Sequence, residues 1–235
     1  MSNDCFSQQQ FLSVEEAINN ILKNVEVIQE SELVAIDHAL ERVLSVDVVS
    51  PVAVPPHDNS AMDGYALNVD KFNVDKPPKL IGRAMAGKPF QGVCHENECV
   101  RIMTGGVVPN SCDSVVMQEH CLVDGEHIRI EKPIKRGQNI RRRGEDIQPE
   151  QVIHEKGKRI SAIDIALFAS VGIGEIEVKR KIKVALIATG DELKTVTESL
   201  STGDIYESNG YFLKHMLAKI NAEVIDYGII ADNFE

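Results

Sequence analysis

The segment at residues 55–66, Pro-Pro-His-Asp-Asn-Ser-Ala-Met-Asp-Gly-Tyr-Ala, constrains the fold more than any other part of the chain. Its two prolines favour an extended entry and exclude a helix. Asp58, Asn59 and Ser60 can hydrogen-bond their own backbone, and Gly64 permits a turn with positive φ. Two interpretations stay open on this segment alone: an ordinary proline-led turn before a strand, or a loop that presents polar side chains at a site.

Two later segments have the same character. Residues 101–106, Arg-Ile-Met-Thr-Gly-Gly, end a strand-like run in a hydroxyl and two glycines. Thr104 and the glycine backbone can offer donors to an anion, although adjacent glycines are also common in hairpins. Residues 138–146 carry the triplet Arg141, Arg142 and Arg143. Arginine holds oxyanions with a planar fork, and the alternative is a solvated basic patch.

Composition narrows the class of protein. A length of 235 residues allows one large domain or two small ones. The net charge of −11 argues against a general surface for nucleic acid or anionic membrane. No apolar run approaches the ~20 residues that span a bilayer. Residues 1–11 lack a signal-peptide pattern and are expected to be a disordered tail, so the expected location is the cytoplasm.

The five cysteines do not form a recognisable framework. They are odd in number and lack Cys-x-x-Cys spacing. A metal at Cys94, His95 and Cys99 is the alternative to ordinary reduced thiols. Reduced thiols in a cytosolic protein fit the pattern better.

The first two-thirds of the chain change from a helical to a β pattern. Residues 12–25 are predicted to form an amphipathic helix with Ser13 as N-cap and Glu16 closing a capping box. A short helix is expected at residues 38–43. Residues 62–135 alternate short apolar runs with glycines, which predicts a small β-barrel or sandwich. Asp124-Gly125 is predicted to be the turn of a hairpin.

The last third predicts an α/β unit. An apolar helix at 161–170, capped by Ser161, precedes a strand at 175–178. Residues 182–188 form an almost continuous apolar run, as buried parallel strands require. A helix capped by Ser208-Asn209 and a strand at 222–226 follow, which predicts the beginning of a doubly wound sheet. Two strands cannot bury such a sheet on both faces, so we expect the chain to be cut inside a domain.

Carboxylates follow the strands of this unit. Open α/β sheets bind ligands outside the C-terminal ends of their strands, where Asp191, Glu192 and Asp232 fall. A pair of carboxylates at that edge suits Mg²⁺, which in turn bridges phosphate oxygens. The alternative is a solvated loop without a ligand.

Five motifs together resemble a known family. DNSAMDGYA, RIMTGG, VVMQE, QNIRRRGEDI and ATGDEL occur in the order and at the spacing of the molybdopterin molybdenumtransferases, which include the bacterial MoeA proteins and the E-domain of gephyrin. The resemblance runs from about residue 12 to the last residue. Family members are longer and carry a later glycine-serine-rich motif and a C-terminal domain. The chain therefore resembles an N-terminal portion of such an enzyme.

The resemblance implies a mixed α/β multidomain fold. A glycine-rich β module at 51–144 would be inserted in an α+β segment made of 12–50 and 145–180. Residues 181–235 would begin a molybdopterin-binding α/β domain, and the helix at 12–25 is a candidate to pack on it. Family members are elongated homodimers whose active site lies between the glycine-rich domain of one subunit and the α/β domain of the other.

The resemblance also implies a reaction. Molybdate is inserted into adenylylated molybdopterin with release of AMP, assisted by Mg²⁺ or a similar divalent ion. The residues that match the family's site are Asp63, Thr104, Arg141, Asp146, Glu192 and Asp232. Glu192 and Asp232 would serve the metal and the nucleotide phosphate, and the other four the pterin and oxyanion. Asp58 and Ser60 are further candidates for binding substrate or anion.

Two other functions compete with this one. A gephyrin-like scaffold would use the same architecture without catalysis. A general nucleotide-binding α/β protein is disfavoured because no GxGxxG or Walker loop is present. The expected partners are small pterin and oxyanion substrates, a second copy of the chain, and other proteins of molybdenum-cofactor biosynthesis. Nucleic acid and membrane are not expected.

Overall fold

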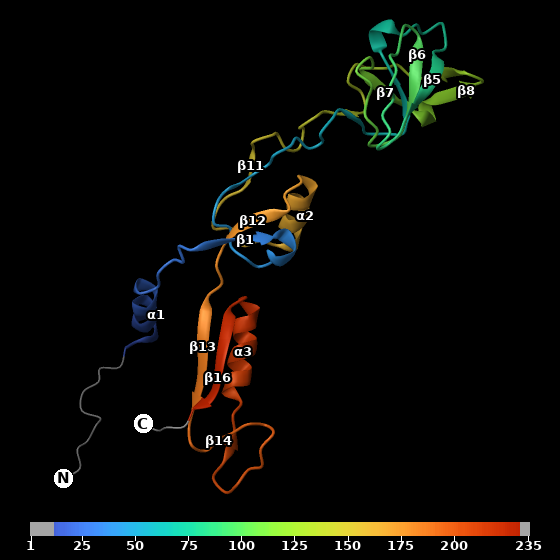
Figure 1. Ribbon diagram of the computed structural model, residues 1–235. Coiled ribbons are helices and arrows are strands. Elements are labelled where there is room, and N and C mark those ends of the chain that lie inside the picture. The colour runs from blue at the N-terminus through green and yellow to red at the C-terminus, as the bar shows by residue number, and fades with distance from the viewer. Residues whose placement is uncertain (1–11, 231–235) are drawn as a thin grey trace, which may run out of the picture. The chain divides into compact units, whose positions relative to one another are not determined.

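A computed structural model describes residues 12–230 as two compact units (Figure 1). One unit is Val34–Ile176, and the other joins Met1–Leu33 with Glu177–Glu235. The predicted tail at 1–11, with Cys5, and the predicted site residue Asp232 lie outside the described residues. Within residues 12–230, no helix has the length and apolarity needed to cross a bilayer.

The unit Val34–Ile176 is organised around a six-stranded sheet with the order β7-β4-β6-β5-β9-β8. Neighbouring strands run antiparallel except β5 and β6, which are parallel. The order ends at β7 and β8, so the pairing confirms a β module but not the expected barrel or sandwich. The strands are β4 (Gly64–Leu67), β5 (Lys79–Ala84), β6 (Glu98–Ile102), β7 (Ser114–Met117), β8 (Cys121–Asp124) and β9 (His127–Ile130).

The sheet carries a hydrophobic core on each face. Successive side chains of a strand point to opposite faces, so β4 contributes Tyr65 and Leu67 to one cluster and Ala66 to the other. All four residues of β4 are buried. The first cluster also contains Cys99, Val116 and Ile128, and the second contains Ala84, Cys94, Val100, Ile102, Val108, Cys112 and Val115.

Backbone geometry favours glycine at two positions, one in a turn of the sheet and one within a strand. The predicted hairpin is confirmed: Asp124 pairs with His127, and Gly125 adopts a φ of 59° in the turn. Gly64 is required for a different reason. A Cβ at this position would lie 1.8 Å from the carbonyl oxygen of Val116, so β4 and β7 approach each other too closely for any side chain.

The same unit contains short paired segments outside this sheet. β2 (Val48–Val49) pairs with β11 (Val152–His154), and β3 (Asn59–Ser60) pairs with β10 (Ile140–Arg141). Short 3₁₀ turns lie at Ile36–His38 (η1), Val69–Lys71 (η2) and Gln118–His120 (η3). The predicted helix α2 is confirmed at Ala162–Ser170, where Ser161 and Asp164 form a capping box.

The expected short helix at 38–43 is wrong. The chain makes the 3₁₀ turn η1 at Ile36–His38 and then places Glu41 at a φ of 64°. The backbone N–H of Glu41 donates to Ile160 O at 2.9 Å, and Val43 bridges Arg159. Pairing with a segment more than a hundred residues away therefore replaces the local helix.

The other unit begins with helix α1 (Val14–Lys23). Its N-cap is Ser13, and Glu16 closes the capping box as predicted. None of its residues is buried, and its apolar side chains are exposed, including Ile21 at 64%. Farther along the chain, β1 (Ser31–Ala35) and β12 (Glu175–Lys179) form a two-stranded sheet.

The remaining elements confirm an α/β unit. β13 (Lys183–Thr189) and β16 (Glu223–Ile230) are parallel, and α3 (Asn209–Lys219) connects toward β16 and contacts both strands. β14 (Leu193–Lys194) and β15 (Ile205–Tyr206) form a short parallel pair in the connection. The sheet that the described residues form has two strands, so the doubly wound description stays a prediction.

Two expectations about this unit need correction. The apolar run at 182–188 is not buried as predicted: Leu186 is 8% exposed, but Ile187 is 51% exposed. The physical reason is that this sheet has only two strands among the described residues, and α3 packs against both of them. Ser208 stands at the N-cap of α3 but makes no side-chain cap bond. Glu207 Oε1 instead accepts from Gly210 N at 2.6 Å.

Candidate functional site

Three motif segments meet at β3 within the unit Val34–Ile176. Ser60 N donates to Gly106 O, and Gly105 N donates to Ser60 O, both at 2.9 Å. On the other side, Ala61 N donates to Asn139 O at 2.9 Å, and β3 pairs with β10. The segment at 58–63 therefore lies between the loop that carries Thr104 and the loop that carries the arginine triplet. Each predicted residue of these three motifs belongs to one connected region.

Asp63 and Thr104 form a direct contact. Asp63 Oδ1 accepts from both Thr104 N and Thr104 Oγ1, each at 2.8 Å. The Thr104 backbone N–H, followed by its hydroxyl and the charge of Arg101, lowers the pKa of Asp63. No residue between 12 and 230 donates to Asp63 Oδ2. The carboxylate is thus held ionised, and its second oxygen can accept from a ligand.

Arg141 is held by two carboxylates. Its Nε donates to Glu145 Oε1 at 2.9 Å, and its Nη2 donates to Asp146 Oδ2 at 2.5 Å. These contacts raise the pKa of Arg141, and the same guanidinium, with the backbone N–H of Arg142, lowers the pKa of Glu145. An oxyanion at Arg141 would have to compete with both carboxylates. The geometry favours Arg141 as a residue that orders the loop.

Asp58 ties the arginine loop to the proline-led segment. Its Oδ2 accepts from Arg142 Nη1 at 2.5 Å, and its Oδ1 accepts from Arg143 N at 2.8 Å. The backbone N–H of Arg143, followed by the side chain of Arg142, lowers the pKa of Asp58. Gly144, at a φ of 72°, donates its N–H to Pro55 O. Asp58 therefore acts first as a structural acceptor between the two loops.

Ser60 has a similar structural role. The residue is 2% exposed, and its hydroxyl donates to Met62 O at 2.5 Å. Its Oγ also accepts from Met62 N at 3.3 Å. The hydroxyl shapes the turn that leads to Asp63 and is committed to it. The predicted contact of Ser60 with an anion finds no support in this geometry.

A pocket of about 410 Å³ lies beside these loops. One wall is apolar or weakly polar, and the other is formed by the charged loop residues. The lining residues are His57, Asp58, Val107, Val108, Pro109, Asn110, Cys112, Arg142 and Arg143. All of them belong to the unit Val34–Ile176.

Glu192 lies in the other unit, just past the C-terminal end of β13. Its side chain folds back over Gly190, where a Cβ would come within 2.8 Å of Glu192 Oε2. Its predicted metal partner, Asp232, lies outside the described residues. Within residues 12–230, no three His, Cys, Asp or Glu side chains gather as a metal site would need.

The cysteines behave as buried apolar residues. Cys94, Cys99 and Cys112 are buried and Cys121 is half-buried, and all four are free. Burial raises the pKa of Cys99 to about 12 and that of Cys121 to about 11. The free thiols fit the prediction of reduced cysteines. Within residues 12–230, Cys94, His95 and Cys99 do not gather into a group that could hold a metal ion.

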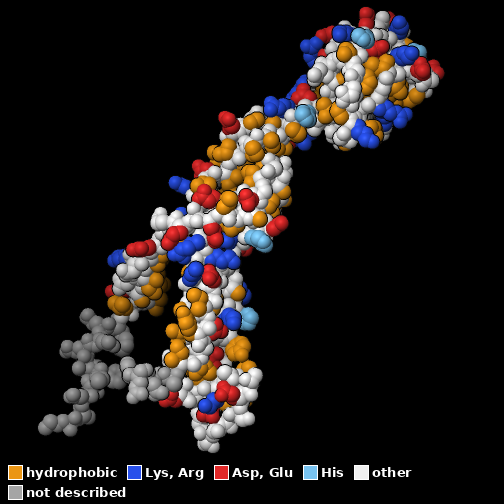
Figure 2. Space-filling view, in the orientation of Figure 1, with side chains coloured by type: hydrophobic (Ala, Val, Ile, Leu, Met, Phe, Trp, Pro, Cys, Tyr) orange, Lys and Arg blue, Asp and Glu red, His pale blue; other side chains and the backbone are white. Residues whose placement is uncertain are grey.

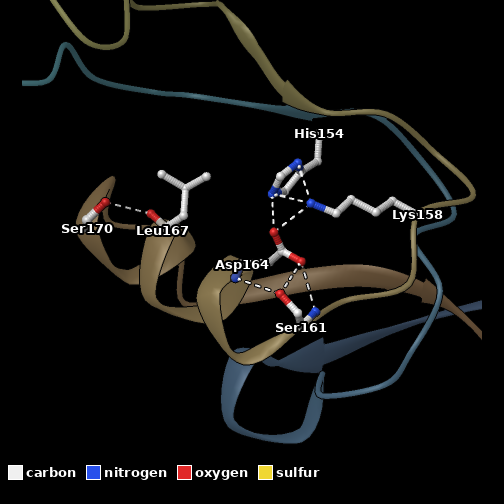
Figure 3. Close-up of polar contacts among 6 residues, drawn as sticks. All are labelled: His154, Lys158, Ser161, Asp164, Leu167 and Ser170. Carbon is white, nitrogen blue, oxygen red and sulfur yellow. Dashed lines mark hydrogen bonds and ion pairs between the residues drawn. The ribbon is translucent and has the colours of Figure 1, made fainter.

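Sequence reasoning missed a polar cluster at the start of α2 (Figure 3). His154 Nε2 and Lys158 Nζ each lie 2.6 Å from Asp164 Oδ1. Asp164 Oδ2 accepts from Ser161 N and Ser161 Oγ, both at 2.8 Å. The capping signal identified Ser161 and Asp164 from the sequence, but nothing local revealed that His154 and Lys158 would join them.

This cluster is structural. Asp164 is 4% exposed, and burial by itself would raise its pKa. The hydrogen bonds from Lys158 and Ser161, with the nearby His154, outweigh burial and hold the pKa of Asp164 well below its ordinary range. His154 also packs edge-on against Phe168, with ring centroids 5.7 Å apart. The cluster thus fastens α2 to β11 around one buried carboxylate.

The sequence is similar to one family of known proteins along most of its length. The family described as the MoeA N-terminal region (domain I and II) matches residues 12–172. The chain is 38% identical to the molybdopterin molybdenumtransferase of Haemophilus influenzae over 224 residues, which cover 94% of this chain and 55% of the relative. It is 33% identical to that of Staphylococcus aureus over 229 residues, covering 95% and 54%.

Solved structures give the same result. The molybdopterin biosynthesis MoeA protein from Pyrococcus horikoshii OT3 matches with a TM-score of 0.85 and 30% identity, covering 94% of this chain and 60% of that one. The chain therefore belongs to the MoeA family. It spans about half the length of the curated relatives it matches.

Proposed function

We propose that this chain provides the pterin- and oxyanion-facing part of an enzyme that inserts molybdate into adenylylated molybdopterin and releases AMP. One observation carries the proposal: three motifs distant in sequence converge on β3 and hold Asp63, Thr104, Arg141 and Asp146 in one region. The name of the relatives, molybdopterin molybdenumtransferase, supports the transfer of molybdenum to molybdopterin.

The residues divide the work in the following way. Asp63 Oδ2 accepts a donor of the pterin, while Thr104 fixes the other oxygen of that carboxylate. Arg141 and Asp146 keep the third loop in place beside it. Because these contacts exist before the substrate arrives, the site needs little rearrangement to bind it. Glu192 serves the nucleotide-phosphate side from the other unit.

Several finer features belong to the same proposal. A divalent cation such as Mg²⁺ would be held by Glu192 with Asp232, two carboxylates of the chemistry that Mg²⁺ prefers. A homodimer would join Asp63 of one subunit to Glu192 of the other. We also propose the domain division at 51–144 and 181–235, and a cytoplasmic location, which the four free cysteines support.

Calorimetry on the 235-residue chain tests the binding part of the proposal. We expect heat of binding with adenylylated molybdopterin and a weaker signal with AMP alone. Asp63→Asn should reduce the affinity for adenylylated molybdopterin, because an amide at this position places a donor where the pterin also donates. Arg129→Gln, an exposed substitution on β9, serves as the control. Binding of AMP alone with undiminished affinity would indicate a general nucleotide-binding protein, and no binding would favour a scaffold.

Subunit exchange tests the shared site in a chain of the relatives' full length. Asp63→Asn and Glu192→Gln homodimers should each be impaired. Random mixing makes about half of the dimers mixed, each with one intact site, so activity should recover to roughly a quarter of wild type. No recovery despite verified exchange would place both residues in the site of one subunit.

A further inference from the structure

The three consecutive arginines have three different environments. Arg141 is bound by Glu145 and Asp146, and Arg142 is bound by Asp58. The guanidinium of Arg143 makes no hydrogen bond or ion pair with any residue between 12 and 230, although its backbone N–H is held by Asp58. One arginine of the triplet is therefore fixed in its backbone and unengaged in its side chain.

The backbone around Arg143 is well anchored. Asp58 Oδ1 accepts from the backbone N–H of Arg143 at 2.8 Å. The N–H of the next residue, Gly144, donates to Pro55 O at 2.9 Å. Asp58 is itself bound to the next loop, because its carbonyl accepts from Val108 N at 2.9 Å. The loop therefore presents the Arg143 side chain from a defined position, which lowers the cost of ordering it on a ligand.

Arg143 lines the pocket of about 410 Å³ described above. Residues 107–110 and His57 line the same pocket, and the His57 side chain has no hydrogen-bond or ion-pair partner among residues 12–230. The lining holds two arginines, Arg142 and Arg143, and one carboxylate, Asp58, which is paired with Arg142, so the charge balance of the pocket is positive. This is unusual in a chain with a net charge of −11.

We propose that Arg143 and His57 bind a tetrahedral oxyanion in this pocket. An arginine fork and a ring N–H are suited to the oxygens of one phosphate-sized group. Asn110 lines the same pocket, and a side-chain amide has donors for a third oxygen. Arg141, the arginine that the family motif singles out, is instead a positioning residue for the loop.

Two sources supply this chemistry: free molybdate, or the phosphate group of an organic ester. The choice between them rests on the proposed function, but the site itself does not, because binding is measured without molybdenum transfer. Pro109 and the two valines give the pocket an apolar wall. That wall would contact the organic part of an ester and leave free molybdate unaffected.

The test is an NMR titration of the ¹⁵N-labelled 235-residue chain with sodium molybdate, inorganic phosphate and methyl phosphate at constant ionic strength. We expect shifts of the backbone amides of His57, Asn110 and Arg143 with at least one of these anions. Arg143→Gln should weaken binding roughly 10-fold or more, because it removes a charge-assisted pair of hydrogen bonds. Arg143→Lys should recover only part of the affinity, since it keeps the charge but loses the fork.

Arg129→Gln is the matched control. Arg129 is exposed on β9 of the same unit and makes no side-chain hydrogen bond or ion pair within residues 12–230, and its loss changes the net charge equally. Unchanged binding in this variant supports the site. Tightest binding of molybdate identifies the free oxyanion, and tightest binding of methyl phosphate identifies an ester. Equal weakening by Arg143→Gln and Arg129→Gln, shifts confined to other regions, or no binding of any anion would overturn the proposal.

Discussion

The two units of this chain bury their apolar residues very differently. In Val34–Ile176, β4 is buried along its whole length, and the sheet has a hydrophobic cluster on each face. In the described residues 183–230, Leu186 is the one buried apolar side chain, and α3 has no buried residue. Figure 2 shows hydrophobic side chains at the surface of the α/β unit, where Phe212 and Tyr227 are 63% and 58% exposed.

The difference in buried apolar side chains indicates which unit can hold a site in place before a ligand binds. The motif loops of Val34–Ile176 are fixed by hydrogen bonds to a unit that has its own core. Glu192 follows a strand whose sheet has little burial within the described residues. A well-packed scaffold can hold functional groups in place before a ligand binds, whereas a region with few buried contacts opens more easily.

The largest effect is expected in hydrogen exchange. Amides of β4 and β6 should be protected roughly 10⁴-fold more than those of β13 and β16, because local opening free energies range from near zero to the global stability. Exchange detected by NMR on the whole chain measures both sets at once. Equal protection of the four strands would show that the α/β unit is stabilised by something other than its own core.

Gly64→Ala tests the packing of the stable unit. A Cβ there would lie 1.8 Å from Val116 O, and backbone cannot move away cheaply, so we expect a loss of about 4 kcal/mol or more in unfolding free energy. Urea denaturation followed by circular dichroism gives the value. Gly125→Ala, in an open turn at a φ of 59°, should cost only about 1 kcal/mol. Similar losses in both variants would refute the close approach of β4 and β7.

Asp164→Ala should destabilise Val34–Ile176 by about 2–3 kcal/mol. The substitution removes the capping carboxylate of α2 and leaves His154 and the partly exposed Lys158 without their partner. The exposed Glu155→Ala, whose side chain has no partner within residues 12–230, should change the unfolding free energy by less than about 0.5 kcal/mol. A loss of similar size in both variants would remove the special role of Asp164.

The contribution of Asp164 should also depend on pH. Its folded-state pKa lies below that of the unfolded chain, so the stabilisation is complete above the unfolded pKa of about 3.9 and disappears as pH falls toward the folded value. The difference in unfolding free energy between wild type and Asp164→Asn should therefore shrink between pH 5 and pH 2.5, as measured by urea denaturation. A difference that stays constant or grows on acidification would contradict the depressed pKa.

The smallest effect is expected at the N-terminal helix. Ser13→Ala breaks the capping box and should raise the exchange rate of α1 amides by a few-fold, equivalent to about 1 kcal/mol. Because α1 has no buried residue, exchange in β13 and β16 should stay unchanged. Faster exchange in those strands would reveal that α1 contributes to the stability of the α/β unit.

The sequence is sufficient to predict elements that depend only on residues a few positions apart. The capping boxes at Ser13 and Ser161 and the hairpin at Gly125 are confirmed, because each depends on residues within a few positions. The helix expected at 38–43 failed because its backbone pairs with residues 158–160. The exposure of Ile187 was missed because burial depends on which elements cover a strand.

The candidate site shows the same limit. Five motifs predict its members, and the described ones among residues 58–146 come together. Their individual contacts were not predictable. That Arg141 is bound to Glu145 and Asp146 while Arg143 is left unengaged depends on side-chain geometry in a folded loop. From the sequence alone, the three arginines cannot be distinguished from one another.

One measurement tests the central claim most directly, namely that the three motif loops of Val34–Ile176 form one substrate site. The ¹⁵N-labelled 235-residue chain would be titrated with adenylylated molybdopterin and followed by backbone amide shifts. We predict concerted shifts at Asp63, at Thr104 and along 141–146, with one shared binding curve. Shifts confined to residues 183–230, or separate curves for the three loops, would contradict the claim.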